Sequence, residues 1–476
     1  MEIWFDKFLT ETEFFKAPDG NLYVTVSVNN HKENWPFKPD KVKKWLRNGF
    51  LKKGDTLPPE REIQDLFNKL EAKGYFNSPV LPVYTRIGEA DGKVYLDLAN
   101  EKWQVIEISG SGWKEVTDSP IKFRRCAGMI PLPNPVHGGS LEDLHKSVNL
   151  PTEKDRILYT SWLIGSLHPK GPYPILFIQG PQGSGKSFLC KLTRSIVDPS
   201  VAPLRAIPKD DWSLMISATN SWVICFDNLT GTLPGWLADD LCRISTGGGL
   251  AVRKHYEDAE ENLFNVRRPV ILNSIDSIVT RHDLADRSII LNIPPISGTT
   301  RKSEIEIQAK FNISLPGILG ALMDAASMAI KNLPSTKLSS LPRMADFAIW
   351  VSAAEPSLPW QNGDFMKAYA GNREEIVEKS LENNSLAYAI RALVEDYVEW
   401  AGNATELLET LGNYVSAKVK KSKFWPKKPN ALSGRINKLR PFLEEVGIEV
   451  DLGREGHGGP KYIRIAKIHK DAEDIR

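Results

Sequence analysis

One short segment has the residue types and spacing that bind phosphate groups. Residues 180–187 read GPQGSGKS, which fits the pattern GxxxxGK[ST]. An apolar run, residues 173–179, precedes it, and a helical pattern follows, which is the setting that the pattern requires. The glycines let backbone N–H groups surround phosphates, and the start of the helix adds its positive dipole end. We therefore expect an ATP site made by Gly180, Pro181, Gln182, Gly183, Ser184, Gly185, Lys186 and Ser187.

A second acidic strand is needed to hold the Mg²⁺ ion that accompanies ATP. Residues 222–228, WVICFDN, end on Asp227 after an apolar run. We expect Asp227 and the Ser187 hydroxyl to ligate Mg²⁺, with Lys186 reaching the β- and γ-phosphates. The next residue, Asn228, can hold a water molecule but cannot take its proton. The identity of the general base therefore stays open, and the only substitutes are the helical acids Asp239 and Asp240.

A third apolar strand ends on Asn273, in the segment PVILN. If this strand lies beside the phosphate loop, Asn273 comes between that loop and Asp227. There it could polarise the attacking water or sense the γ-phosphate. The alternative is an asparagine that caps the following turn.

Two arginines, Arg281 and Arg287, flank a short acidic segment before the next strand, residues 288–293. A guanidinium from a neighbouring subunit can stabilise charge on the γ-phosphate in the transition state. Arg287 is the first candidate for this role and Arg281 the second. The alternative is a pair within the chain with Asp283 or Asp286.

Between the strands that end at Asp227 and Asn273 lies TGGGLAVRKHYEDAEENLF, residues 246–264. The glycines and the alternating LAVR predict a hairpin with a basic and aromatic tip. Such side chains neutralise phosphates and stack on bases without reading sequence. We expect DNA contacts from Arg253, Lys254, His255 and Tyr256. The alternative is a surface hairpin with ordinary solvated charges.

With these motifs in this order, the chain resembles superfamily-three AAA+ helicases, the viral hexameric kind, and poxvirus-type primase-helicases. The likeness is strongest over residues 150–300. The resemblance implies a hexameric ring with ATP between subunits and a Lys254-His255 hairpin in the central pore. More loosely, NSWVICFDN, DLCRISTGGG, HDLADR and LPRMADFAIW are similar to replication proteins of prophages and integrative elements. In that likeness, Arg343 is a candidate lid arginine, or else a partner of Asp346.

The segment from Lys418 to Arg440 carries nine lysines and arginines and no acid, with Phe424 and Trp425 between them. A helix over 430–447 and two strands around a glycine-rich loop follow, the order of a winged helix. DNA contacts would then come from Lys427, Lys428, Arg435, Lys438 and Arg440. The alternative is a winged helix that packs on the ring or on a partner protein, with Trp425 in the core.

These motifs need a multidomain chain to position them. Residues 1–135 predict an α+β N-terminal domain of unknown role, in which Lys122, Arg124 and Arg125 form a small basic patch. A proline-rich linker, residues 129–140, leads into an α/β P-loop AAA+ core over 140–310, where strands and helices alternate. Helices dominate 311–400, and the winged helix occupies 401–470. The helix expected near the middle covers 315–333, and another covers 385–402.

Composition narrows the protein class. The net charge is +2, so any nucleic-acid surface must be local. The four cysteines have no metal-site or disulfide spacing, which fits a reducing compartment. The N-terminus lacks the basic start and apolar stretch of a signal peptide, and no run of about 18 apolar residues is present. We expect a soluble, cytoplasmic protein without a membrane partner.

The combined expectation is an ATP-dependent DNA helicase or translocase that replicates a phage or mobile element. It would use ATP and Mg²⁺, assemble as a hexamer around single-stranded DNA, and cooperate with a primase or initiator. The alternative is an AAA+ initiator or helicase loader that remodels protein–DNA complexes without processive unwinding. A small-molecule P-loop kinase is disfavoured, because no acceptor pocket is recognisable.

Overall fold

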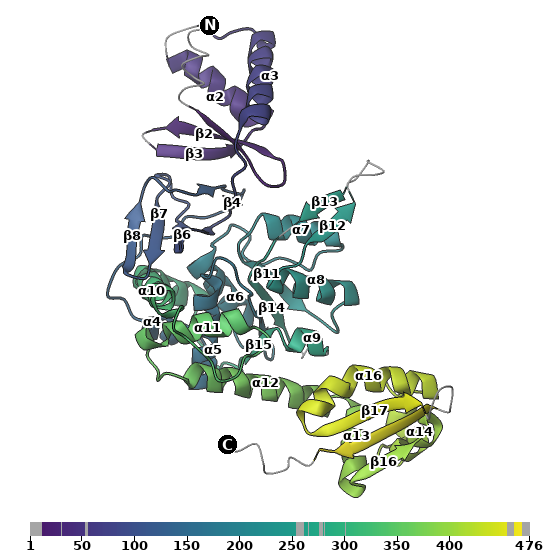
Figure 1. Ribbon diagram of the computed structural model, residues 1–476. Coiled ribbons are helices and arrows are strands. Elements are labelled where there is room, and N and C mark those ends of the chain that lie inside the picture. Colours follow the sequence, from purple (N-terminus) through teal and green to yellow (C-terminus); the bar gives the residue numbers. More distant parts are fainter. Residues whose placement is uncertain are drawn as a thin grey trace.

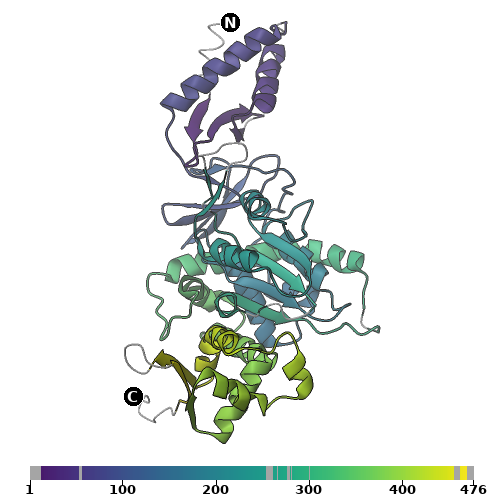
Figure 2. The ribbon, with the colours of Figure 1, turned by 90° about the vertical axis from the view of Figure 1, so that its right-hand side faces the viewer.

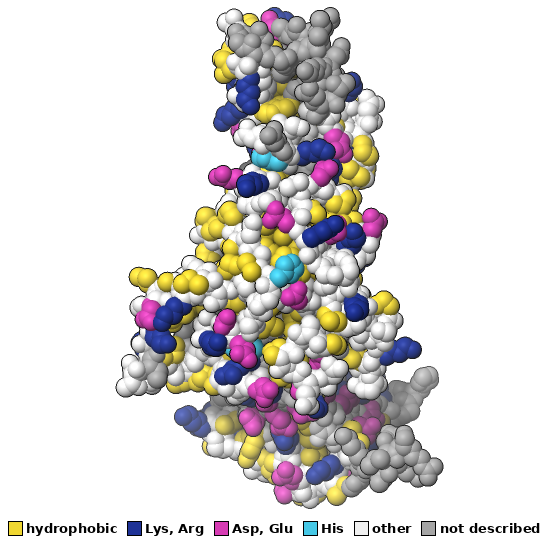
Figure 3. Space-filling view, turned by 90° about the vertical axis from the view of Figure 1, so that its left-hand side faces the viewer, with side chains coloured by type: hydrophobic (Ala, Val, Ile, Leu, Met, Phe, Trp, Pro, Cys, Tyr) yellow, Lys and Arg dark blue, Asp and Glu magenta, His cyan; other side chains and the backbone are white. Residues whose placement is uncertain are grey.

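The computed structural model describes residues 12–29, 31–52, 56–253, 261–264, 266–275, 279, 281–299, 301–454 and 461–468. The molecule is elongated, with the N-terminal region at one end and the C-terminal region at the other (Figures 1 and 2). It is a multidomain mixed α/β protein, as expected. On the face drawn in Figure 3, cationic and anionic side chains of the described residues are interspersed.

The N-terminal end combines strands and helices around a small apolar core. Strands β1 (Glu13–Lys16), β2 (Leu22–Val28) and β3 (His31–Pro36) form an antiparallel sheet. Two amphipathic helices, α2 (Pro39–Lys52) and α3 (Glu60–Asn77), bury Leu46, Phe67 and Leu70 with the strand residues Val24 and Val26.

A second antiparallel sheet connects this end to the centre. It contains β5 (Ile87–Ala90), β6 (Lys93–Asp97), β7 (Val105–Ser109) and β8 (Gly112–Val116), next to the short pair β4 (Val83–Tyr84) and β9 (Lys122–Phe123). Its residues Leu96 and Ile106 share one apolar core with the helices of the central part. The expected boundary near residue 135 therefore divides elements that pack together.

The centre is a parallel sheet of four strands in the order β11-β14-β10-β15. The strands are β10 (Ile175–Gln179), β11 (Ile224–Leu229), β14 (Val270–Ser274) and β15 (Ser288–Asn292). Their residues are mostly buried because helices cover both faces, which explains the continuous apolar runs. These helices include α4 (Leu141–Ser147), α5 (Glu153–Ser166), α6 (Lys186–Val197), α7 (Asp211–Thr219) and α8 (Gly235–Thr246).

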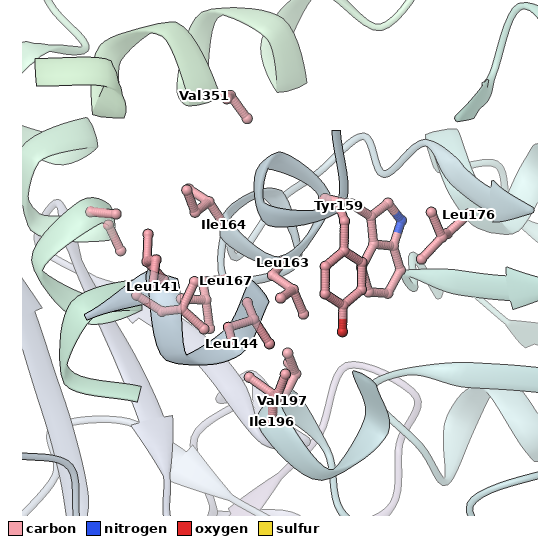
Figure 4. Close-up of a cluster of buried hydrophobic side chains, with 14 of the residues drawn as sticks. Leu141, Leu144, Tyr159, Leu163, Ile164, Leu167, Leu176, Ile196, Val197 and Val351 are labelled. Carbon is pink, nitrogen blue, oxygen red and sulfur yellow. The ribbon is translucent and has the colours of Figure 1, made fainter. Parts of the chain in front are cut away.

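Figure 4 shows the core beneath one face of this sheet. Helix α5 lies at its middle and contributes Tyr159, Leu163 and Ile164, while Leu176 comes from β10 and Val351 from α11 (Ala345–Ala354). All five side chains are buried. The backbone that follows β10 into the phosphate loop therefore starts from a rigid, close-packed base.

The expected helix over 315–333 is longer: α10 covers Glu304–Asn332 and holds Pro316 in its interior. The Ser303 side chain accepts a hydrogen bond from the N–H of Glu306 and caps the actual start. By length and composition α10 is long and apolar enough to cross a membrane, contrary to the sequence expectation. However, 56% of its most apolar stretch is buried inside the protein, as in the core helices of water-soluble proteins.

The proline-rich stretch expected as a linker lies along α10. The N–H of Val136 donates to the carbonyl of Pro316 at 2.9 Å. A Cβ on Gly320 would come within 1.9 Å of the Val136 carbonyl oxygen, so glycine is required for this close approach. The proline-rich segment therefore packs against α10 and is not a free linker.

Helix α12 (Asp364–Glu382) leads from the centre to the C-terminal region. That region contains α13 (Ser385–Asp396), β16 (Glu399–Gly402), α14 (Ala404–Gly412), α15 (Ala417–Lys421), α16 (Pro429–Glu445), β17 (Ile448–Arg454) and β18 (Lys461–Lys467). The expectation of one helix over 385–402 was wrong, because β16 pairs with β18 instead. The resulting sheet order is β16-β18-β17.

Candidate functional site: a phosphate loop and its acidic strand

The phosphate loop leaves the carboxyl end of β10 and enters α6. A Cβ on Gly180 would lie 2.2 Å from the carbonyl oxygen of Ile293, so only glycine fits beside the neighbouring strand. Gly185, directly before α6, has a φ of 87°, in the left-handed region that favours glycine. The GPQGSGKS pattern thus has the strand–loop–helix setting that sequence analysis expected.

Three of the expected site residues converge from three elements. Ser187 Oγ on α6 lies 3.0 Å from Asp227 Oδ1 at the end of β11. Asn273 Nδ2, at the end of β14, lies 3.1 Å from Ser187 Oγ and also donates to Asp227 Oδ1. This follows from the sheet order, because β14 lies between β10 and β11. Asn273 is therefore where sequence analysis placed it, and its catalytic role remains a prediction.

These residues open into a cleft of about 460 Å³. Its described lining consists of Gln182, Gly183, Gly185, Lys186, Ser187, Phe188, Asp227, Asn228, Asn273, Ser274, Ile275 and Glu304. A second recess of about 410 Å³ shares Asp227 and Asn228 with it and adds Leu204, Arg205, Ala206 and Ile207. The two recesses beside Asp227 and Asn228 are large enough for the phosphates of ATP and for the groups that act on them.

The donors at this cleft suit a nucleoside triphosphate with Mg²⁺. Lys186 Nζ lies 2.8 Å from the Pro181 carbonyl oxygen, and burial lowers the pKa of Lys186 while Asp227 partly offsets this shift. The Ser187 hydroxyl and the Asp227 carboxylate are the hard oxygen ligands that Mg²⁺ prefers. When bound, Mg²⁺ would neutralise charge on the β- and γ-phosphate oxygens.

Asn228 stands at the exposed end of β11 with a φ of 59°. Asparagine tolerates this left-handed conformation better than most residues, and the pairing register of β11 with β14 shifts at this point. The residue lines both recesses, so its amide can hold a water molecule there. The alternative bases fit less well. Asp239 pairs with Arg281 at 2.6 Å, Asp240 pairs with Arg243 at 3.1 Å, and neither is among the described residues of the cleft.

Two further residues support the loop and a third lines the cleft, and none of them was found from the sequence. Asn149 Nδ2 donates to the carbonyls of Ser184, at 3.2 Å, and Pro294, at 2.9 Å. Arg301 Nη2 donates to the Gly183 carbonyl at 3.3 Å, and Glu304 lines the cleft from the start of α10. The Ser303-x-x-Glu306 cap signals a helix start in the sequence, but no local pattern shows that this start faces the phosphate loop.

Both candidate finger arginines contact their own chain. Arg281 pairs with Asp283 and Asp239, each at 2.6 Å, and the hydrogen bonds that it donates to these carboxylates, Asp283 first, raise its pKa. Arg287 Nη1 donates to the Asp283 carbonyl at 2.7 Å, while its buried Nε has no partner among the described residues. Neither arginine is among the described residues of its own cleft, and the proposed role in a neighbouring site remains a prediction.

An ion network ties this arginine segment to the C-terminal region. The short helix α9 (His282–Ala285) follows Arg281, and His282 Nε2 lies 2.7 Å from Glu445 Oε1 on α16. Arg373 on α12 lies 2.5 Å from both Glu445 and Asp286. Hydrogen bonds to Asp286 and Glu445 raise the pKa of His282 to about 9. The segment that carries both arginines is therefore fastened to α12 and α16.

The basic hairpin occupies the expected place between β11 and β14. Strands β12 (Leu250–Arg253) and β13 (Glu261–Phe264) pair antiparallel, with Arg253 opposite Glu261 (Figure 1). The expected contacts Lys254, His255 and Tyr256 lie outside the described residues, as does the side chain of Arg253. The base of a hairpin is thus present, and its DNA contacts remain a prediction.

Several expected basic contacts are engaged within the chain. Arg435 donates to the carbonyls of Phe424 and Lys423, Lys427 donates to the carbonyl of Lys420, and Arg440 pairs with Glu444 at 2.7 Å. Lys428 and Lys438 are exposed, and Trp425 belongs to the core.

The N-terminal basic patch is occupied by internal partners. Lys122 pairs with Glu13, Arg125 pairs with the Asp97 carboxylate, and Arg124 donates to the carbonyl of Thr219 at the end of α7. These three side chains thus stabilise the N-terminal region and its packing on the centre. Arg343 is exposed before α11, and the described residues show no ion pair between it and Asp346.

Comparisons with solved structures give distant likenesses. The A form apo structure of the NrS-1 C-terminal region is 14% identical over 98% of this chain and 99% of that chain, with a TM-score of 0.43. A JCV helicase structure with a bound acetamide compound is 15% identical over 47% of this chain and 67% of that chain, with a TM-score of 0.27. At these values the likenesses carry no information about activity. No curated protein matches the chain.

Two family models match the chain in succession. The model of the actinomycete integrative conjugative element replication protein matches residues 141–363, which contain the phosphate loop, Asp227 and Asn273. The model of the AICE RepA C-terminal domain matches residues 386–473. Because the two matches follow one another and together cover more than half of the chain, this protein belongs to the RepA family of replication proteins from actinomycete integrative conjugative elements.

Proposed function

We propose that this replication protein is an ATP-driven DNA helicase or translocase that works as a hexameric ring. The convergence of Ser187, Asp227 and Asn273 beside the phosphate loop carries the proposal. This arrangement has one ligand set for Mg²⁺, one lysine for the phosphates and one amide to position water. These groups could together hydrolyse ATP, by positioning the attacking water and by stabilising the negative charge on the phosphates.

DNA engagement is proposed from two regions. The hairpin of β12 and β13 lies in the chain between β11 and β14, the two strands that carry Asp227 and Asn273. In the C-terminal region, α16 is followed by the antiparallel strands β17 and β18, and this order supports a winged helix that contacts DNA. Arg287 from the adjacent subunit would complete each ATP site.

The test is ATP hydrolysis by the purified chain with and without single-stranded DNA, for the wild type and for Lys254→Ala/His255→Ala. Strong stimulation that the double variant loses supports a DNA motor that grips the strand with its hairpin. A chain that binds ATP but stays monomeric and ignores DNA in every nucleotide state would rule the proposal out.

A second candidate is an initiator or helicase loader that uses the same ATP site. The exposed lysines of the C-terminal region favour it, because they could supply DNA binding without the hairpin. In that case DNA stimulation survives Lys254→Ala/His255→Ala, and strand separation is weak.

A further inference from the structure

The segment from Lys418 to Lys428 joins α15 to α16 and concentrates positive charge. Six lysines are exposed there: Lys418, Lys420, Lys421, Lys423, Lys427 and Lys428. Among the described residues none of them forms an ion pair, whereas exposed lysines elsewhere, such as Lys310 and Lys367, do. The ammonium groups of these six lysines are therefore available to bind an anionic partner.

An aromatic ring stands in the middle of these lysines. The Phe424 side chain is 69% exposed, and Lys423 Nζ lies 5.1 Å from the centre of its ring. Its neighbour Trp425 is only 4% exposed and packs in the core of the C-terminal region. Burial of Trp425 anchors the segment, but an exposed phenylalanine adds almost nothing to folding stability.

Side-chain hydrogen bonds hold the backbone of the segment that carries Phe424. Arg435, on α16, donates to the carbonyl of Phe424 and, at 3.3 Å, to the carbonyl of Lys423. Lys427 donates to the carbonyl of Lys420 and closes the base of the loop. Arg435 therefore fixes the backbone from which the ring projects, and a ring whose backbone is fixed before binding loses less entropy when a ligand stacks on it.

We propose that residues 418–428 form a single-stranded nucleic-acid site in which Phe424 stacks on one base and the surrounding lysines contact phosphates. Arg435 is a positioning residue for this site. The inference rests on the proposed function, since it takes DNA as the ligand. A single strand fits better than a duplex, because paired bases are stacked on each other and hide the faces that a ring would cover. Stacking of this kind accepts any base.

The test uses the full chain, without nucleotide, and two fluorescent strands of equal length: oligo(dT) and a strand in which abasic sites replace the thymidines. Both carry the same phosphates, but only oligo(dT) offers bases. Phe424→Ala should weaken oligo(dT) binding by about fivefold to about 150-fold and leave the abasic strand unaffected. Phe424→Trp should retain oligo(dT) binding.

The same measurements in the Lys254→Ala/His255→Ala background separate this site from the hairpin. Arg435→Ala should weaken only oligo(dT), as expected for a residue that positions the ring. An equal loss on the abasic strand would make Arg435 a phosphate ligand instead and overturn its assigned role. Because Phe424 is exposed, unchanged thermal melting of Phe424→Ala controls for folding.

Equal oligo(dT) affinity for Phe424→Ala and the wild type overturns the site, and the exposed ring is then a contact for a protein. In that case, ATP hydrolysis that single-stranded DNA still stimulates leaves the proposed motor intact. If the wild type neither binds oligo(dT) nor hydrolyses ATP faster in the presence of single-stranded DNA, the result overturns both the nucleic-acid site and the proposed motor.

Discussion

Ser187 Oγ and Asp227 Oδ1 lie 3.0 Å apart although 40 residues separate them in the chain. The start of α6 and the end of β11 thus place a hydroxyl and a carboxylate at one mouth of the cleft. The two oxygens have the spacing of neighbouring ligands of one metal ion, and Asn273 contacts both residues. Removal of either ligand should therefore affect hydrolysis more than folding.

Asp227→Asn should reduce ATP hydrolysis by at least about 100-fold, because the amide carries no charge to hold Mg²⁺ at the phosphates. Hydrolysis at saturating ATP is the readout, and nucleotide affinity is measured separately with a fluorescent analogue. Asp239→Asn is the matched control, since its carboxylate pairs with Arg281 outside the described lining of the cleft. A loss of the same size in Asp239→Asn would instead make Asp239 the general base.

Arg287→Ala should lower hydrolysis by about 10³-fold or more if the guanidinium acts on the site of a neighbouring subunit. Mixing this variant with Lys186→Ala should then restore part of the activity. In the mixture, some interfaces combine an intact phosphate loop with an intact arginine. An inactive mixture would contradict action between subunits, and the same pairing with Arg281→Ala tests the second candidate.

Asp198→Ala should lower the free energy of unfolding by about 3–5 kcal/mol. This carboxylate is buried between Arg86, at 3.2 Å, and Arg194, at 3.0 Å, and it also accepts the backbone N–H of Trp222. Its loss leaves two buried guanidinium groups without their counter-charge. Thermal melting measures the effect. Asp118→Ala, from the exposed pair with Lys32, should cost less than about 1 kcal/mol. Equal effects of the two substitutions would refute this account.

The contribution of His282 to stability should depend on pH. Its folded pKa of about 9 is above the ordinary value of 6.5, because hydrogen bonds to Asp286 and Glu445 favour the charged ring. The charged His282 ring therefore stabilises the fold fully below about pH 6.5, and this stabilisation is lost as the pH rises through about 9. The two carboxylates must stay ionised, and Arg373, the other cation of the network, keeps its charge over this range.

The measurement is the difference in melting temperature between wild type and His282→Gln at pH 6.5 and at pH 9.5. We expect the wild type to be more stable at pH 6.5 and the difference to shrink at pH 9.5. His31→Gln is the control, because the ion pair that the described residues show for His31 is with Glu33 on its own strand. A difference that is constant with pH would show that the charge of His282 contributes nothing.

The sequence by itself determined those features that depend on near neighbours in the chain. The phosphate loop needs glycines at set positions between a buried strand and a helix, so its pattern is visible locally. The apolar runs that end in Asp227 and Asn273 are visible for the same reason, since both faces of the parallel sheet are buried. The position of Asn273 between the loop and Asp227 followed from the expected strand order, which the structure has.

Only the tertiary structure decided which charged groups have partners. Arg124 and Arg125 look like a free basic patch in the sequence, but residues far along the chain provide their acceptors. Residues 399–402 continue a helical pattern, yet they form a strand because β18, more than 60 residues later, offers its edge. His282 and Glu445 meet across 163 residues. Hydrogen bonds and ion pairs of this kind depend on which surfaces pack together, and no local pattern of residues contains that information.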